Sequence, residues 1–239
     1  MLYLLSLFFV CSGIVIAIII GRDLSRNKQS MKIMNAVWIL TALWASYLGL
    51  WAYYKFGREK MKMTDGEGME MDMPMGNEKM NMSMGGMNMG GSLPKWQSIA
   101  LSALHCGAGC TLADVIGEGI TFHIPVSIAG SMLIGNWVLD FVLALIIGVY
   151  FQFYAIHEME KISVGEGLTR AFRADFFSLL SWQVGMYGWM AIVYFVLFKD
   201  LAKDSWTFWF MMQIAMLFGF ICAYPMNALL IRMGIKKGM

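Results

Sequence analysis

The residue types best suited to chemistry are concentrated in one short stretch, His-Cys-Gly-Ala-Gly-Cys at residues 105–110. Asp114 and Glu118 follow Cys106 and Cys110 at four-residue steps. Residues four apart on a helix share a face, so the two thiols and two carboxylates would form one polar stripe. A charged group at bilayer depth costs about 3 kcal/mol or more, so such groups usually face a bundle interior. The spacing therefore predicts an ion path or site along this helix.

Two thiolates one turn apart can hold one metal ion, as paired histidines do on a zinc-binding helix. Cys106 and Cys110 are such a pair, and His105 is the candidate third ligand. His105 projects about 100° away from Cys106, so it joins the site only if the helix is locally distorted. Gly107 and Gly109 would let a metal or a neighbouring helix approach the backbone closely. The alternative is a packing helix with two buried thiols, and diverging Cβ directions disfavour a disulfide between them.

The segment from residue 61 to residue 89 is dense in methionine, largely as Met-x-Met. Its spacers are polar or glycine, so it is not expected to fold alone. A thioether is a soft, neutral ligand that selects Cu(I) or Ag(I), so the segment predicts capture of a soft metal ion. The alternative is a methionine-biased linker with an adaptable apolar surface. The methionines are Met61, Met63, Met69, Met71, Met73, Met75, Met80, Met82, Met84, Met87 and Met89.

The elements that must position these residues are apolar runs. The chain is 59% hydrophobic and 14% charged, which is typical of a membrane protein, and runs of about 20 residues are long enough to cross a bilayer. We therefore predict an all-α polytopic membrane bundle of about six transmembrane helices. The expected spans are 2–20, 33–54, 96–122, 132–155, 175–198 and 206–233.

The spans divide the chain into three parts. Residues 1–56 are expected to form a two-helix membrane hairpin, residues 57–95 a flexible metal-binding loop, and residues 96–239 a four-helix membrane core. The polar stretch 157–173 is interpreted as an interfacial connector. The net charge of +2 is too small and dispersed to indicate nucleic-acid binding.

Two later spans carry further soft ligands. Met186 and Met190 lie four residues apart, on one face with Gln183, and Met212 and Met216 repeat the spacing in the last span. Such a pair on one helix is typical of packing. Two pairs in a chain with a methionine-rich loop and a cysteine pair favour a route for a soft ion.

Two further carboxylates fall in the predicted spans. Asp140 is an intramembrane residue and so a candidate for the ion path, although a hydrogen bond between helices would also explain it. Asp175 is a second candidate, with a helix N-cap as the alternative.

The chain from residue 105 onward resembles a prokaryotic family of uncharacterised membrane proteins known only as a domain of unknown function. The resemblance implies a small helical membrane core and supplies no activity. The methionine-rich loop is similar in composition to the copper-gathering segments of copper transporters and periplasmic copper-resistance proteins. The stretches that carry the family resemblance are His-Cys-Gly-Ala-Gly-Cys at 105–110 with Asp114 and Glu118, Ala-Asp at 174–175, Ser-Trp-Gln-Val-Gly-Met-Tyr-Gly at 181–188, Phe-Trp-Phe-Met-Met-Gln at 208–213 and Tyr-Pro-Met-Asn at 224–227.

Together these features predict a membrane protein that binds and transports Cu(I), with Ag(I) or Zn(II) as other candidate ions. The loop would capture the ion, the cysteines with His105 would bind it in the membrane, and the four bundle methionines would extend its path. Asp114 and Glu118 would carry compensating protons or polarise the site. No phosphate-cradling loop indicates ATP hydrolysis, so transport would be passive, proton-coupled or driven by a partner.

Two other classes of function remain open. The chain could be an accessory subunit or metallochaperone that delivers copper to a membrane copper enzyme, alone or as a homo-oligomer. It could instead be a membrane redox protein that uses the cysteine pair, or a haem protein. For haem, the candidate histidine ligands are His105, His123 and His157.

The expected location is the lipid bilayer of a prokaryotic plasma membrane. With six spans, lysines and arginines are twice as frequent on the side of the termini and the methionine-rich loop as on the other side. The positive-inside rule would place that side in the cytoplasm. Capture of Cu(I) by methionine favours the opposite side, away from cytosolic thiols, so sequence alone leaves the side of the loop open.

Overall fold

The computed structural model describes residues 1–29, 31–58, 95–159, 163–198 and 201–236. Within them, the chain is helical and contains no strand beyond an isolated bridge between Ile128 and Ser131. The helices are α1 (Leu2–Arg26), α2 (Lys32–Ala52), α3 (Lys95–His123), α4 (Met132–Met159), α5 (Val164–Ile192) and α6 (Trp206–Arg232), with single π-helical turns η1 (Tyr53–Gly57) after α2 and η2 (Val193–Leu197) after α5.

Six helices in the described residues are long and apolar enough to cross a membrane. The predicted all-α bundle is therefore confirmed, and the chain has the character of a multi-pass membrane protein. The stretch expected to be an interfacial connector is largely helical, because α4 continues to Met159 and α5 begins at Val164. Asp175 consequently lies eleven residues inside α5, so it is not an N-cap.

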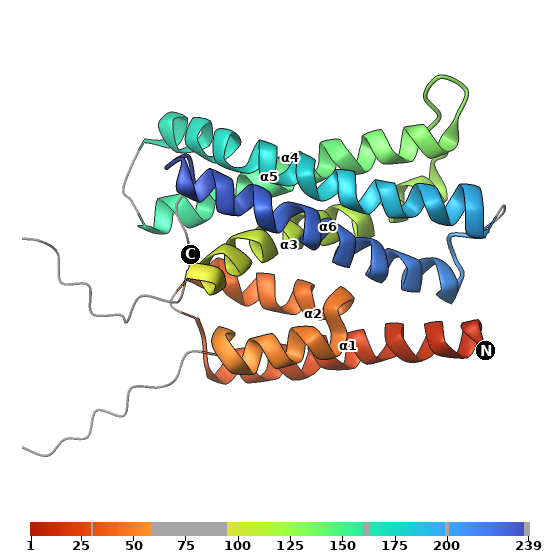
Figure 1. Cartoon of the computed structure of the whole chain (residues 1–239), viewed down its shortest axis with the longest axis horizontal. Coiled ribbons are helices and arrows are strands. Elements are labelled where there is room, and N and C mark those ends of the chain that lie inside the picture. The colour runs from red at the N-terminus through yellow and green to blue at the C-terminus, as the bar shows by residue number, and fades with distance from the viewer. Residues whose placement is uncertain (30, 59–94, 160–162, 199–200, 237–239) are drawn as a thin grey trace, which may run out of the picture.

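Helix α2 is not a straight rod, because it folds back on itself at Ser46. The backbone there has φ 43° and ψ −118°, far from helical values. Trp38 and Phe56 would be far apart on a straight helix, yet their ring centroids are 5.8 Å apart. Tyr53 also donates a hydrogen bond of 2.7 Å to Asp23 near the end of α1. The two halves of α2 therefore run antiparallel, and both ends of α2 lie at the same end of the bundle (Figure 1).

A helix break inside a membrane leaves backbone carbonyls without helical partners, and these must be satisfied from elsewhere. Gln213 of α6 supplies the donor, because its Nε2 atom lies 2.6 Å from the carbonyl oxygen of Leu43. Ser46 Oγ lies 3.4 Å from the carbonyl oxygen of Phe9. Gly13 makes room, since a Cβ there would lie 2.5 Å from the Leu43 oxygen. Contacts from α1 and α6 thus stabilise the fold-back.

Replacing Gln213 with leucine should lower the free energy of unfolding by about 1–3 kcal/mol, because the partly buried Leu43 carbonyl would lose its donor. Thermal unfolding of the purified chain in detergent measures the effect. The same replacement at Gln97, in the first turns of α3, is the control. Equal midpoints for the two variants would contradict the role given to Gln213.

Because of the fold-back of α2, the start of α1 and the end of α6 lie at opposite ends of the bundle, and not on one side as six simple spans would place them (Figure 1). We call the end with the start of α1, the end of α3 and the start of α6 the N side, and the other end the C side. Among the described lysines and arginines, Lys203 lies at the N side and all others lie on the C side. Arg58 and Lys95, which flank the methionine-rich segment, are both on the C side.

Helix α3 occupies the centre of the bundle, between the pair α1 and α2 and the pair α4 and α5 (Figure 1). In its most apolar window 78% of the residues are buried, against 28% in α1. The predicted close approach at its glycines is confirmed. The ring of Trp182 fills the space where Gly107 would carry a Cβ, and a Cβ at Gly109 would lie 3.1 Å from the Cα atom of Gly148 in α4.

Candidate functional site

The polar stripe of α3 is buried except at Glu118, its last member. Cys106 and Cys110 are fully buried, and Asp114 is 3% exposed. Glu118 ends the stripe near the N side, where its side chain is 11% exposed. The central place of α3 explains this burial, because neighbouring helices cover each face. The predicted stripe is therefore a feature of the bundle interior.

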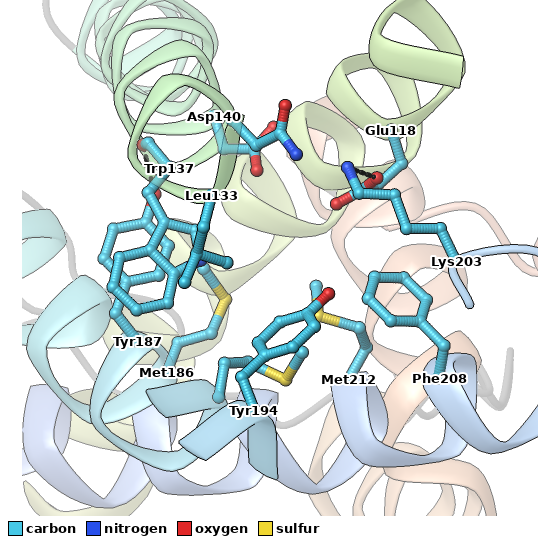
Figure 2. A pocket seen from close by; sticks show the side chains of 12 residues that line it. Glu118, Leu133, Trp137, Asp140, Met186, Tyr187, Tyr194, Lys203, Phe208 and Met212 are labelled. Carbon is cyan, nitrogen blue, oxygen red and sulfur yellow. Dashed lines mark hydrogen bonds and ion pairs between the residues drawn. The ribbon is translucent and has the colours of Figure 1, made fainter. Parts of the chain in front are cut away.

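Near the Glu118 end of the stripe lies a small cavity of about 20 Å³, which we call the methionine cavity. Three of the four predicted bundle methionines line it: Met186 and Met190 from α5, and Met212 from α6. All three are at most 9% exposed. Figure 2 shows Met186 and Met212 with Asp140 and Glu118 around the same space. The cavity thus combines thioethers with carboxylates.

Lys203 links Glu118 to the N side of the bundle. Its Nζ atom lies 2.6 Å from Glu118 Oε2 and 3.2 Å from the Thr121 hydroxyl. The two charged groups face each other beside the cavity (Figure 2), and the Lys203 side chain is 30% exposed. The spacing of the sequence predicted Glu118 but not its partner, which comes from the loop before α6.

Two carboxylates near the cavity have oxygens without a hydrogen-bond partner among the described residues. Both oxygens of Asp114 and the Oδ1 atom of Asp140 are in this state, although the residues are 3% and 5% exposed. Asp140 Oδ1 packs directly against the backbone of Gly117. Buried carboxylate oxygens without a donor are costly, and they are natural acceptors for a cation or a proton.

Two larger hollows adjoin the methionine cavity. The N-side hollow, of about 460 Å³, shares Asn136, Tyr194 and Lys203 with it. The second, of about 310 Å³, shares Met212 with it and is lined by Met216 and Asp114. We call the second the α2 hollow, because Leu43 and Trp44 beside the fold-back also line it. The methionine cavity therefore borders both larger hollows.

The two cysteines are engaged with neighbouring side chains. Cys106 Sγ lies 2.6 Å from Asp175 Oδ1, 3.0 Å from Ser178 Oγ and 3.2 Å from the ammonium of Lys236. Cys110 Sγ lies 4.0 Å from Gln183 Nε2. Neither thiol is in a disulfide. Among the described residues, no group of three or more His, Cys, Asp or Glu side chains is placed to hold a metal ion.

His105 faces away from the cysteines. Its ring is fully buried, lies edge-on to Phe151 at 6.0 Å, and has no hydrogen-bond partner on either nitrogen among the described residues. His123 and His157 are exposed residues near opposite ends of the bundle. The three histidines therefore do not converge on one haem.

The methionines of the loop that were predicted as ligands lie outside the described residues. They are Met69, Met71, Met73, Met75, Met80, Met82, Met84, Met87 and Met89. The structure brings together Met186, Met190 and Met212 with Glu118 and Asp140, and it places Met216 one hollow away.

Comparison with known proteins gives a family but no activity. Residues 95–236 match the family described as a domain of unknown function (DUF4396), which covers more than half of the chain. No curated protein and no solved structure matches the sequence.

Proposed function

The chain belongs to the family of the domain of unknown function DUF4396, and from the site alone we propose that it binds Cu(I) in the membrane and moves it across. The observation that carries the proposal is the methionine cavity. Two helices bring Met186, Met190 and Met212 to one buried space that also meets Glu118 and Asp140.

The ligand types favour a soft monovalent ion. Thioethers bind Cu(I) and Ag(I) and are poor ligands for harder ions, while a structural zinc site is built from four Cys or His ligands. The carboxylates of Glu118 and Asp140 supply the negative charge that thioethers lack. A cavity of about 20 Å³ is close to the space of one water molecule, so one dehydrated ion would fill it.

The hollows on either side support movement as well as binding. An ion entering the N-side hollow would meet the Lys203–Glu118 pair first and the methionine cavity next. Met212 borders the cavity and the α2 hollow, so it is placed to pass the ion between them. In this proposal Asp114 and Asp140 balance the ion's charge by holding or releasing protons, since each has an unpartnered oxygen.

The charge distribution supports one orientation in a prokaryotic plasma membrane. Lysines and arginines of the described residues are concentrated on the C side, which the positive-inside rule assigns to the cytoplasm. In this proposal the methionine-rich segment joins the C side between Arg58 and Lys95 and exchanges Cu(I) with the bundle there.

Metal binding by the bundle can be tested apart from metal binding by the methionine-rich loop. A chain lacking residues 61–89 is expected to keep at least one Ag(I) per molecule, because the cavity holds a single ion. Elemental analysis of the desalted protein, with Ag(I) as a redox-stable probe for Cu(I), measures this. The full chain should bind more, and a truncated chain without silver would overturn the bundle site.

A further inference from the structure

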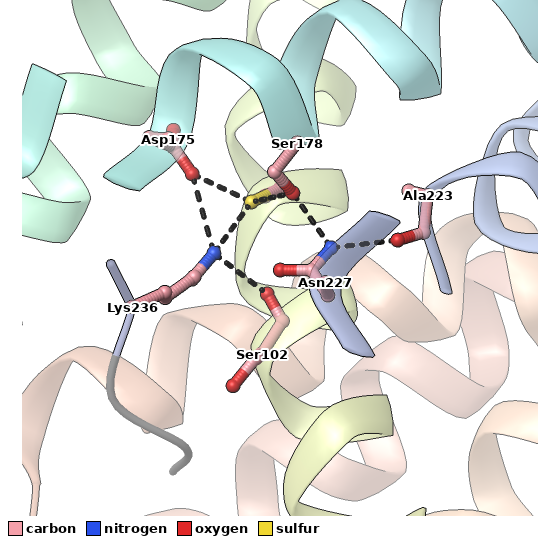
Figure 3. A network of polar contacts seen from close by, with 7 residues as sticks. Ser102, Asp175, Ser178, Ala223, Asn227 and Lys236 are labelled. Atoms are coloured by element: carbon pink, nitrogen blue, oxygen red, sulfur yellow. Dashed lines mark hydrogen bonds and ion pairs between the residues drawn. The ribbon is translucent and has the colours of Figure 1, made fainter. Parts of the chain in front are cut away.

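A lysine side chain is buried at the opposite end of the polar stripe. Lys236 follows α6 and its side chain is fully buried, as is that of Asp175. Its Nζ atom lies 3.2 Å from Cys106 Sγ, 3.4 Å from the Ser102 carbonyl oxygen and 3.5 Å from Asp175 Oδ1. Figure 3 shows the ammonium among these three atoms. An ammonium has three N–H donors, so the surroundings match it.

Burying the Lys236 ammonium is costly unless the surrounding atoms stabilise a cation. Removing an ion from water costs several kcal/mol even after relaxation. The environment offers a carboxylate, a carbonyl and a sulfur atom from two helices, α3 and α5. Because the Cys106 thiol donates to Asp175 at 2.6 Å, its sulfur lone pairs remain available to Lys236.

A second layer of side chains holds the arrangement in place. Ser178 contacts Cys106 at 3.0 Å and accepts a 2.6 Å hydrogen bond from the Asn227 amide of α6. Asn227 is fully buried, and its amide oxygen has no hydrogen-bond partner among the described residues. Figure 3 shows that oxygen directed toward the space beside Lys236. An unpartnered acceptor at a buried cluster indicates capacity for a further ligand.

We propose that Lys236 occupies a second cation site of this protein, and that a soft monovalent ion displaces it and binds Cys106, Asp175 and the Ser102 carbonyl. The lysine is a tethered competitor: it fills the site when no ion is present and leaves when the ion arrives. The site is distinct from the methionine cavity, which is lined by other residues.

The charge of the cluster selects a monovalent ion. When its sulfur binds the ion as a thiolate, Cys106 passes its proton along the existing hydrogen bond to Asp175. Exchanging one ammonium for one Ag(I) or Cu(I) then leaves the net charge of the buried group unchanged, whereas Zn(II) would add an uncompensated positive charge. Sulfur as a ligand favours the soft ions over Na⁺ or K⁺. The identity of the ion as Cu(I) rests on the proposed function, but the exchange itself does not.

The Lys236 site lies at one end of the polar stripe of α3, so it can control entry of an ion to the stripe. Cys106 begins the α3 stripe on the C side, as Glu118 ends it near the N side. A lysine therefore pairs with each end, Lys236 with Cys106 and Asp175, and Lys203 with Glu118. While Lys236 fills the site, no ion can occupy the C-side end of the stripe. An ion that binds there displaces the lysine and so opens this end of the path in the same step.

The test is amine labelling of the full-length wild-type protein. A membrane-permeant acetylating reagent should leave Lys236 unmodified without metal, and saturating Ag(I) should raise its modification by about 10-fold or more. Mass spectrometry maps the acetylated positions. Lys28, which is exposed, is the internal reference and should be labelled equally in both samples. Zn(II) should leave Lys236 protected.

Two results would overturn the proposal: modification of Lys236 that does not depend on Ag(I), or release by Ag(I) that persists in a Cys106→Ser chain. Cys106→Ala serves as the second variant if the serine chain does not fold. A Met186, Met190 and Met212 triple leucine chain should still release Lys236 with Ag(I). The experiment therefore distinguishes a failure of the methionine cavity to bind metal from a failure of the exchange at Lys236.

Discussion

Replacing Met186, Met190 and Met212 together with leucine should lower Ag(I) flux into proteoliposomes by at least about 100-fold, because loss of groups that merely support a metal site already costs 10- to 100-fold. The three side chains line the methionine cavity and contribute its soft ligands. Leucine has nearly the same volume as methionine and keeps the packing, so the fold should survive. A loss of Ag(I) flux would then be due to the missing thioether ligands and not to misfolding.

The matched control is Met211→Leu together with Met34→Leu. Both methionines are 5% exposed, and neither lines the methionine cavity. Met211 is the sequence neighbour of Met212, so the pair tests whether any buried methionine matters or only those at the cavity. Flux is measured by the rise of silver inside vesicles after quenching. A triple variant that transports as fast as the control would contradict the assignment.

Replacing Gly107 with valine should lower the free energy of unfolding by about 3 kcal/mol or more, beyond the usual range for overpacking. The indole of Trp182 occupies the position of a Cβ at Gly107, and on its other side Trp182 Nε1 lies 2.5 Å from where Gly219 would carry one. Trp182 also packs edge-on against Trp44 at 5.8 Å. The ring has no free direction in which to move, so α3, α5 and α6 would separate.

Gly119→Val is the control, because Gly119 is on the same helix and a Cβ there meets nothing within 4 Å. Valine at that position should leave stability unchanged within about 0.5 kcal/mol. Size-exclusion profiles and thermal unfolding in detergent give the comparison. Equal stability of the two variants would mean that α3 and Trp182 do not pack as described.

Much of the fold follows from the sequence because its signals are local. Long apolar runs predicted the helices, and four-residue spacing predicted the shared face on which Cys106, Cys110 and Asp114 are buried. The same spacing drew attention to Met186, Met190 and Met212, although only the packing of α5 against α6 places them around one cavity. Periodicity shows which face of a helix a residue lies on, and not which other helix it meets.

The remaining features depend on contacts between distant parts of the chain. Ser46 stands in a continuous apolar run without a nearby proline, so nothing local marks the fold-back, and Gln213 of α6 stabilises it. The partners of the stripe are equally distant: Lys203 pairs with Glu118, and Lys236 with Cys106. A lysine beside an apolar helix ordinarily indicates an interface with water, which is why neither was predicted to lie at the site.

An anomalous difference map from crystals soaked in Ag(I) tests the central claim most directly. The account predicts a silver peak in the space lined by Met186, Met190 and Met212, beside Glu118 and Asp140. A chain with the three methionines replaced by leucine should lose that peak. Silver bound elsewhere in the bundle, with the methionine cavity empty at saturating Ag(I), would contradict the account.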